Sequence, residues 1–542
     1  MKEKPKKSAL SALSNALWSF RTMLRSTPQS FWLMALAVPL AVFLAWAEIR
    51  LPALVVAEVT QGQSFAHAAL AVGLLLGATL LAAALGEFLQ SMQKVYATRF
   101  RFRQDAALDA KSMRCFYQQY ESKAVRDLQE RASSALWMNS GSVPFLEVPQ
   151  QAMSIVQNLL CYFLFGTVIS FASPWLVLLL TLAPLVNWFC VRAYNRCEYR
   201  ARVERADLEK RLRYTAKRSA DFAAAKDIRV YGMADWLRGI YRDLTEQHLA
   251  WKDRLNRRRL LPCLADLCVI LLRDGAAYAV LISMALRGEL TADRFLLYFA
   301  AISGFATFVG NLLSAWNTMQ AASLKVSDYR QFMELPDTDG TGTAHAADHR
   351  EHAPEITFDH VSFRYDGAAH DTLHDISLTL RAGEHVALVG LNGAGKTTLV
   401  KLLCGLYAPT SGTIRIDGVP AAEFRRDDYA ALFAPVFQEV RTACFSLAET
   451  AACAFGPEVD RERAERCLRA AGLGEKLDAL PHGMDTHLDK QVNPDGIELS
   501  GGEAQKLMMA RALYKDAPVL VLDEPTAALD PIAENEVYEQ YR

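Results

Sequence analysis

The sequence has 542 residues, with 59 Lys and Arg against 60 Asp and Glu, 51% hydrophobic residues and a mean hydropathy of +0.06. This composition excludes a disordered chain, a collagen-like chain and a small disulfide-stabilised domain. The formal net charge of -1 leaves no basic surplus to neutralise phosphates, so nucleic acid is not an expected partner of the whole chain. A mean hydropathy near zero fits either one ordinary globular protein or an apolar half averaged with a soluble half.

Apolar segments long enough to cross a membrane, which takes about 20 residues as a helix, occur six times in the first three-fifths of the chain. They cover residues 31–47, 65–89, 155–171, 175–191, 261–286 and 295–316. The second and fourth connections between them are rich in Lys and Arg, whereas the first, third and fifth contain few. Because basic residues favour the cytoplasmic side, both termini are predicted to be cytoplasmic.

The segment before the first span is basic and carries apolar residues at helical spacing. These are Leu10, Leu13, Leu17, Phe20 and Leu24. The pattern is typical of an amphipathic helix that lies in the membrane interface, and it is equally typical of an ordinary packed helix. No small-residue cleavage site is evident before the first span, which argues against a cleaved signal peptide.

The composition changes after the sixth span. Residues 334–355 are polar, aperiodic and rich in Gly, Thr, Asp and His, as expected of a linker. From Ile356 onward, short apolar strands alternate with helices, the pattern of an α/β domain. We therefore predict a membrane all-α six-helix domain followed by an α/β domain. The expected parts are a cytoplasmic leader at 1–29, the six spans and their long helical connections at 30–333, the linker, and the α/β domain at 356–542.

A glycine-rich motif stands near the start of the α/β domain. Residues 385–399, HVALVGLNGAGKTTL, combine a predicted buried strand, a loop and a helix start, and match the P-loop pattern of phosphate-binding proteins. The glycines let backbone N–H groups turn toward phosphates, and the helix N-terminus adds a favourable dipole. Lys396 is expected to contact the β- and γ-phosphates and Thr397 to ligate Mg²⁺.

Two further motifs follow the P-loop. The apolar stretch VLVLD ends in Asp523, which is followed by Glu524. An acidic residue at the carboxyl end of a parallel strand beside a phosphate loop is suited to hold Mg²⁺, which leaves Glu524 to deprotonate the attacking water. Between these motifs, residues 500–503 precede a predicted helix over 504–514, either as a second phosphate-facing helix start or as a plain N-cap.

Taken together, these motifs make the second half of the chain resemble the nucleotide-binding domain of an ABC transporter. GLNGAGKTT matches Walker A, LSGGE the signature, VLVLDEP Walker B, and ALD the D-loop, which contains Asp530. Gln438 in PVFQE matches the Q-loop, whose glutamine contacts Mg²⁺ and water, and Tyr365 matches the aromatic residue that stacks on adenine. The resemblance makes the P-loop NTPase an ABC ATPase domain, with ATP and Mg²⁺ as its cofactors.

The resemblance also assigns roles to individual residues. It implies that ATP is bound by Tyr365, Gly390, Asn392, Gly393, Gly395, Lys396, Thr397, Thr398 and Asp523. It implies that Mg²⁺ is held by Thr397, Gln438 and Asp523, and that Glu524 and Gln438 are catalytic. The signature residues, which contact the ATP of a second domain, are Ser500, Gly501, Gly502 and Glu503.

Six spans, long cytoplasmic connections and a C-terminal ATPase domain resemble an exporter-type (type IV) half-transporter. This resemblance implies ATP-driven export of a drug, lipid or peptide by a homodimer or a heterodimer with a second half-transporter. The implied location is the bacterial plasma (inner) membrane, in contact with lipid and with the ATPase domain cytoplasmic. Short coupling helices are expected near 117–125 and 233–244. An importer of the same fold and an ATP-binding regulatory or gated membrane protein without efficient turnover are the alternatives.

The family's domain continues beyond the D-loop to another strand and to the H-loop histidine, whereas this sequence ends at Arg542, soon after Asp530. Either a fragment of a longer protein or a natural truncation with impaired hydrolysis would give this pattern. The intact upstream motifs favour a fragment. For the sequence as written, ATP binding is therefore better supported than turnover.

Charged residues inside the predicted spans are costly and usually face a cavity or a partner. They include Glu87, Asp266, Arg273 and Asp274. One interpretation is a polar lining for the substrate path. The other is that Arg273 pairs with Asp266 or Asp274 to satisfy helix packing, and the sequence favours neither.

Overall fold

The computed structural model describes residues 12–523 except 63, 138–142, 223, 338–341, 343, 346–351, 439–441 and 491, and describes no side chains at 186–207, 258–259, 261–262 and 266. The chain forms two compact units. The first comprises Met1–Ala107 and Glu130–Gln331, and the second comprises Leu108–Gln129 and Phe332–Arg542. Residues 108–129, in the middle of the first long cytoplasmic connection, therefore belong by their contacts with the C-terminal part of the chain.

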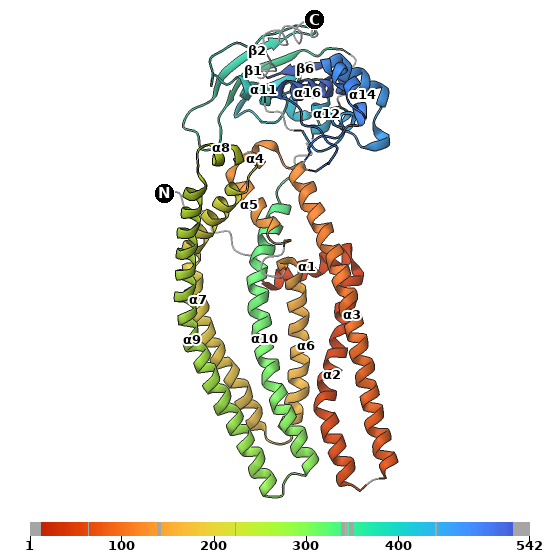
Figure 1. The fold of residues 1–542 in the computed structure, drawn as a ribbon, viewed down its shortest axis with the longest axis vertical. Helices are drawn as coiled ribbons and strands as arrows, with labels where there is room; N and C mark the ends of the chain where they lie inside the picture. The colour runs from red at the N-terminus through yellow and green to blue at the C-terminus, as the bar shows by residue number, and fades with distance from the viewer. Residues whose placement is uncertain are drawn as a thin grey trace. The chain divides into compact units, whose positions relative to one another are not determined.

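Long helices dominate the first unit, and each of the six predicted spans lies in one of them to within a residue (Figure 1). They are α2 (Pro28–Thr60), α3 (Phe65–Arg114), α6 (Pro144–Ser170), α7 (Pro174–Ser219), α9 (Ala234–Leu286) and α10 (Ala292–Met333). The shorter helices before the linker are α1 (Ala12–Ser26), α4 (Tyr117–Glu121), α5 (Lys123–Ser133) and α8 (Ala225–Val230). The α4 and α8 helices fall in or next to the two segments where coupling helices are expected.

The long helices have the apolar character that a membrane requires. Five of them, α2, α3, α6, α9 and α10, are long and apolar enough to cross it. The described apolar part of α7 is Pro174–Leu185, and the rest of the fourth predicted span lies where side chains are not described. The α9 helix has 53 residues. At about 1.5 Å per residue it far exceeds the roughly 30 Å of hydrocarbon, so it continues out of the membrane as predicted. The prediction of a multi-pass integral membrane protein is confirmed.

A hydrophobic cluster joins α6, α7, α9 and α10 within the first unit. It includes Phe165 of α6, Leu180 of α7, Leu281 of α9 and Phe305 of α10, all fully buried. A Cβ atom added at Gly304 would lie 2.9 Å from the Phe165 ring. Glycine at this position therefore lets α6 and α10 approach closely, the usual role of small residues between membrane helices.

The leader helix α1 is packed against the protein on one face and exposed on the other, so it combines the packed and the interfacial arrangements that its sequence left open. The buried Asn15 amide donates hydrogen bonds to the hydroxyls of Ser323 (2.6 Å) and Ser327 (2.7 Å) of α10. A buried amide bonded in this way holds α1 firmly, because breaking the contact would leave polar groups unsatisfied. Leu13 and Leu17 lie on the exposed surface of the same helix. The polar face is therefore packed, and the leucine face is available to lipid.

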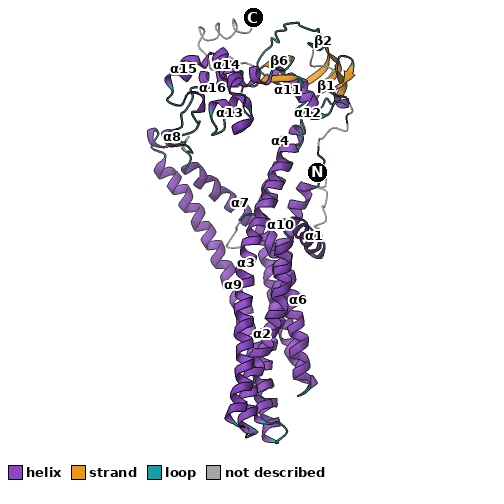
Figure 2. Cartoon of the chain, turned by 90° about the vertical axis from the view of Figure 1, so that its right-hand side faces the viewer, coloured by secondary structure: helices purple, strands orange, loops and turns teal. Residues whose placement is uncertain are grey.

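The strands that the structure describes lie in the second unit (Figure 2), and they confirm the α/β class. An antiparallel sheet has the order β2-β1-β3-β4 and consists of β1 (Ile356–Phe363), β2 (Leu373–Leu380), β3 (Ser411–Ile416) and β4 (Val419–Pro420). The strands β5 (Phe433–Val436) and β6 (Val519–Leu522) form a parallel pair. The α-helices are α11 (Lys396–Leu403), α12 (Arg426–Ala431), α13 (Leu447–Ala452), α14 (Arg461–Leu468), α15 (Gly474–Ala479) and α16 (Gly501–Lys515).

The prediction of a buried strand leading into the P-loop is wrong for the described structure. Residues 385–390 have no strand pairing, and Val389 is 91% exposed. A strand is defined by its hydrogen-bonded neighbours, and a buried parallel strand needs them on both sides. Within the part of the chain that the structure describes, β5 and β6 pair with each other and neither pairs with 385–390.

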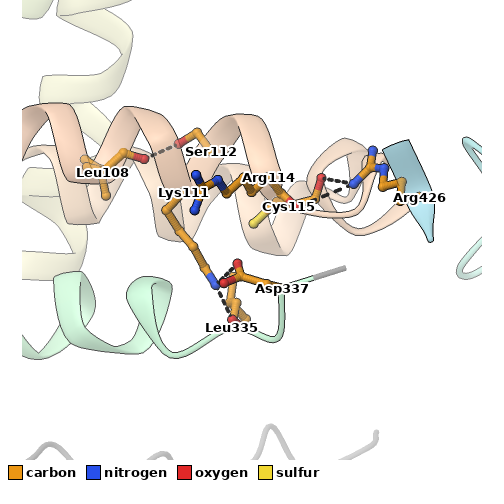
Figure 3. A network of polar contacts seen from close by, with 8 residues as sticks. All are labelled: Leu108, Lys111, Ser112, Arg114, Cys115, Leu335, Asp337 and Arg426. Carbon is orange, nitrogen blue, oxygen red and sulfur yellow. Dashed lines mark hydrogen bonds and ion pairs between the residues drawn. The ribbon is translucent and has the colours of Figure 1, made fainter. Parts of the chain in front are cut away.

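A buried lysine connects the end of α3 to the segment after α10 (Figure 3). Lys111 is only 7% exposed, and its ammonium donates to the carbonyl oxygen of Leu335 and to the carboxylate of Asp337. Both contacts lie within the second unit. Since a buried ammonium is costly unless it is paired, this contact fixes the start of the predicted linker against α3.

A second cation lies at the same end of α3. The Arg426 guanidinium donates to the backbone carbonyls of Arg114 and Cys115, each at 3.4 Å (Figure 3). Free carbonyls at a helix C-terminus carry partial negative charge and favour a cation. The first cytoplasmic connection is thus attached to α12 as well as to the linker.

We expect the Asp337→Asn variant to lower the stability of the second unit by about 1 to 2 kcal/mol, because Lys111 would lose its charge partner in a buried position. The measurement is the thermal unfolding midpoint of the detergent-solubilised chain. The matched control is Asp235→Asn, which breaks a 2.7 Å contact with Arg238 between two highly exposed side chains. Such exposed pairs contribute little. Equal midpoints for the two variants would contradict the prediction.

Candidate nucleotide-binding site

The P-loop has the backbone geometry that its glycines predict. Gly393 and Gly395 have positive φ values of 83° and 92°. A Cβ atom at Gly395 would lie 2.7 Å from a methyl carbon of Leu373, so both backbone conformation and space require glycine there. Gly395 is the N-cap of α11, and the helix begins at Lys396 as predicted. The N–H groups of its first turn therefore adjoin the loop, an arrangement suited to phosphate.

The two predicted Mg²⁺ ligands of the Walker motifs lie together. The Thr397 hydroxyl donates a 3.2 Å hydrogen bond to Oδ1 of Asp523, which is 5% exposed. Asp523 is placed by its own backbone N–H, which donates to the carbonyl of Val436 at 2.9 Å and extends the β5–β6 pairing. The Lys396 ammonium reaches across the loop to the carbonyl of Gly390 at 2.8 Å. Hydroxyl and carboxylate oxygens are hard ligands, so this donor set fits Mg²⁺.

Gln438 lies at the same edge of the parallel pair as Asp523. The register pairs Val436 with Leu522, so the residues that follow β5 and β6 leave the sheet side by side. The metal-side role of Gln438 stays a prediction. Two other predicted residues, Glu524 and Asp530, lie outside the described residues.

Tyr365 packs beside the P-loop helix. Its hydroxyl is 3.0 Å from the Thr398 hydroxyl, and its ring is in edge contact with Phe363, with centroids 5.0 Å apart. About a third of the residue (36%) is exposed. A partly exposed aromatic ring beside a phosphate loop fits the predicted contact with a base. Gly390 and Asn392 lie in the exposed loop itself.

The signature residues form a helix start, with a hydrogen-bonded N-cap. The Ser500 hydroxyl accepts from the N–H of Glu503, and the Glu503 carboxylate accepts from the N–H of Ser500 at 2.9 Å. Gly501 and Gly502 open α16, three residues earlier than predicted. Although burial would raise the pKa of Glu503, the hydrogen bond from the Ser500 N–H and the ammonium of Lys476 hold it below its usual value. The carboxylate therefore remains ionised and keeps the cap closed near neutral pH.

The signature and the P-loop belong to different hydrophobic clusters of the same domain. Leu402 and Leu403 of α11 pack with the antiparallel sheet. Leu507 and Met508 of α16 pack with α13 and β5. The two motifs therefore have separate structural supports, which is compatible with a signature that contacts another copy's nucleotide.

Of the charged residues predicted for the substrate path, two are in contact. Nε of Arg273 lies 2.7 Å from Oδ1 of the adjacent Asp274, and both side chains are half-buried. This contact agrees with the pairing alternative. Glu87 is exposed on α3, and the side chain of Asp266 is not described.

Sequence reasoning missed two residues that adjoin this site, Lys401 and Tyr407. Lys401 lies on the last turn of α11, the helix that begins at Lys396. The prediction of this helix from the P-loop motif was the signal that could have placed Lys401 near the site. Tyr407 follows that helix and belongs to no recognisable motif. It lies in edge contact with Tyr365, with ring centroids 5.6 Å apart.

Comparison with known proteins identifies a family model and several relatives. Residues 373–527 match the family model described as ABC transporter. The ATP-dependent lipid A-core flippase of Burkholderia pseudomallei is 46% identical over 185 residues, 34% of this chain and 30% of that protein. The subtilin transport ATP-binding protein SpaT of Bacillus subtilis is 27% identical over 372 residues, 68% of this chain and 60% of that protein. The aligned regions thus cover less than two thirds of either relative.

The fold resemblance extends over nearly the whole chain. A solved bacterial Atm1-family ABC exporter with ATP bound superposes with a TM-score of 0.74 at 20% identity, covering 96% of this chain and 89% of that one. Residues 373–527 therefore match the ABC transporter family, and the chain has the fold of an ABC exporter, in which a transmembrane domain is fused to a nucleotide-binding domain.

Proposed function

We propose that the chain is one half of an ATP-driven exporter of a small or amphipathic substrate. The observation that carries the proposal is the contact between Thr397 and Asp523 beside the P-loop, in a chain whose other unit is built of membrane-length helices. Two relatives are named for lipid A-core and for subtilin, so a lipid or a peptide is the favoured substrate class. The proposed location is the bacterial inner membrane.

Each residue of the site has a distinct task in this proposal. The loop N–H groups and Lys396 bind the phosphates, and Tyr365 stacks on the base. Thr397, Asp523 and Gln438 hold Mg²⁺, which neutralises charge that develops on the transferred phosphoryl group. Glu524 takes a proton from the attacking water.

A dimer completes the site. The P-loop and the signature rest on separate clusters within one chain, which supports a head-to-tail pair in which Ser500 and Gly502 of each copy face the other copy's γ-phosphate. ATP would close the pair, and the cytoplasmic connections would pass this motion to the spans. The second copy is either the same chain or another half-transporter. Within the spans, Glu87, Asp266, Arg273 and Asp274 are proposed to line the substrate path.

The test is reconstitution of the chain in proteoliposomes, with Mg-ATPase activity and ATP-dependent movement of a fluorescent lipid analogue measured together. A drug and a cationic peptide serve as the other candidate substrates. We expect ATP binding, and we expect turnover to rise with the transported substrate and not with the other two. ATP binding without turnover or transport would instead support a regulatory membrane protein, and accumulation in the opposite direction would support an importer.

A further inference from the structure

The short helix α4 docks on the nucleotide-binding domain of its own chain. The N–H of Ala408 donates to Oε1 of Gln118 at 3.2 Å, and the rings of Tyr117 and Tyr407 lie 6.1 Å apart. These residues all belong to the second unit. The first cytoplasmic connection is therefore in direct contact with the segment that follows the P-loop helix.

Tyr407 is the centre of this contact. It is 2% exposed, and its hydroxyl donates to the carboxylate of Glu121 and accepts from the ammonium of Lys401 at 3.1 Å. Lys401 also lies 3.7 Å from the Glu121 carboxylate, which closes a triangle of charge-assisted contacts. Burial and the hydrogen bond to Glu121 raise the pKa of Tyr407 far above its usual value. The phenol therefore keeps its proton and remains a donor at physiological pH.

The Tyr407 ring also contacts two aromatic rings of the strand end that precedes the P-loop, those of Phe363 and Tyr365. Its ring stacks on Phe363, with centroids 4.9 Å apart and planes at 7°, and meets the Tyr365 ring nearly at right angles, at 87°. The Tyr365 hydroxyl in turn contacts Thr398, next to the predicted Mg²⁺ ligand Thr397. Edge contacts between aromatic rings have preferred geometries, so a fixed Tyr407 restricts the orientations open to Tyr365.

We propose that Glu121 and Tyr407 are positioning residues that hold Tyr365 ready for the nucleotide base. The hydroxyl of Tyr407 is fixed by Glu121 and Lys401, and its ring supports Tyr365 from the side. Holding a binding group in its bound orientation lowers the entropy lost on binding. The inference rests on the proposed function, since it requires Tyr365 to contact the base. It adds that α4 takes part in base binding within the same chain.

The test compares ATP with inorganic tripolyphosphate, which has phosphates and no base. Calorimetric titration of the full chain in detergent, with Mg²⁺ present, gives the affinity for each. We expect Tyr407→Phe and Glu121→Gln each to weaken ATP binding roughly fivefold while tripolyphosphate binding stays within about twofold of the parent chain. In a Tyr365→Ala background, Tyr407→Phe should cause no further loss.

The matched control is Tyr429→Phe, which removes another buried hydroxyl of the domain, bonded to the carbonyl of Leu403 at 2.9 Å. It should leave the ratio of the two affinities unchanged. Equal weakening of ATP and tripolyphosphate by Tyr407→Phe, or no weakening of either by both test variants, would overturn the inference while leaving the proposed function intact. Failure of the parent chain itself to bind ATP would overturn both.

Discussion

Replacing Lys396 with Ala should raise the dissociation constant for Mg-ATP about 100-fold or more. Lys396 supplies the charged side chain of the P-loop, and its ammonium already spans the loop to Gly390 at 2.8 Å. Charge-assisted hydrogen bonds contribute about 1.5 to 3 kcal/mol each, and two phosphate contacts would be lost together. A loss of about 3 kcal/mol corresponds to a factor of roughly 100. Equilibrium titration of the detergent-solubilised chain with Mg-ATP measures the effect.

Lys506→Ala is the matched control for this variant. Lys506 is on α16 of the same domain, and its ammonium also contacts a glycine carbonyl, that of Gly472, at 3.4 Å. Its removal deletes the same charge without touching the P-loop, so affinity for Mg-ATP should remain close to that of the parent chain. Equal affinities for Lys396→Ala and the parent chain would contradict the assignment of the phosphate site. Equal losses of affinity for Mg-ATP in both lysine variants would show that the effect comes from the change in net charge and not from a phosphate contact of Lys396.

The parts of this site that the sequence predicted are those fixed by local chemistry. Gly395 has a φ of 92° and no room for a Cβ atom, so the loop cannot form with another residue there. The glycine in the motif is therefore enough to predict the backbone conformation of the loop. The same holds for Ser500 and Glu503, whose reciprocal hydrogen bonds form the capping box that the S-x-x-E spacing encodes. The spans were also predictable, because an apolar segment of about 20 residues is long enough to cross a membrane and is uncommon in other settings.

The parts that the sequence did not predict depend on partners far away in the chain. Residues 385–390 have the composition of a buried strand, yet strand formation is decided by pairing, and none occurs among the described residues. Tyr407 and Glu121 are 286 positions apart, and no periodicity connects them. The orientation of α1 was likewise open, because the leucine spacing does not show that Asn15 is bonded to residues 308 and 312 positions away.

Replacing Glu524 with Gln should lower the rate of ATP hydrolysis about 100- to 1,000-fold while the affinity for Mg-ATP changes little. A positioned general base typically contributes a factor of about 10² to 10⁴, and an amide of the same size cannot accept the proton. The assignment rests on the sequence, where Glu524 directly follows the buried Asp523. Because Asp523 and Thr397 are unchanged in this variant, metal and phosphate binding should persist. Phosphate release by the reconstituted chain and its titration with Mg-ATP measure the two quantities separately.

Asp523→Asn should change binding in place of leaving it intact, and it serves as the comparison. This variant weakens a metal ligand that Thr397 contacts at 3.2 Å, so its affinity for ATP should fall in Mg²⁺ and remain unchanged in EDTA. If Glu524→Gln loses only turnover and Asp523→Asn loses Mg²⁺-dependent binding, the two adjacent carboxylates have different roles. Glu524 then transfers the proton, and Asp523 holds the metal. If Glu524→Gln hydrolyses ATP as fast as the parent chain, the water is activated by another group and Glu524 has no basic role. If it also loses Mg²⁺-dependent binding, both carboxylates hold the metal, and the division of roles between them is wrong.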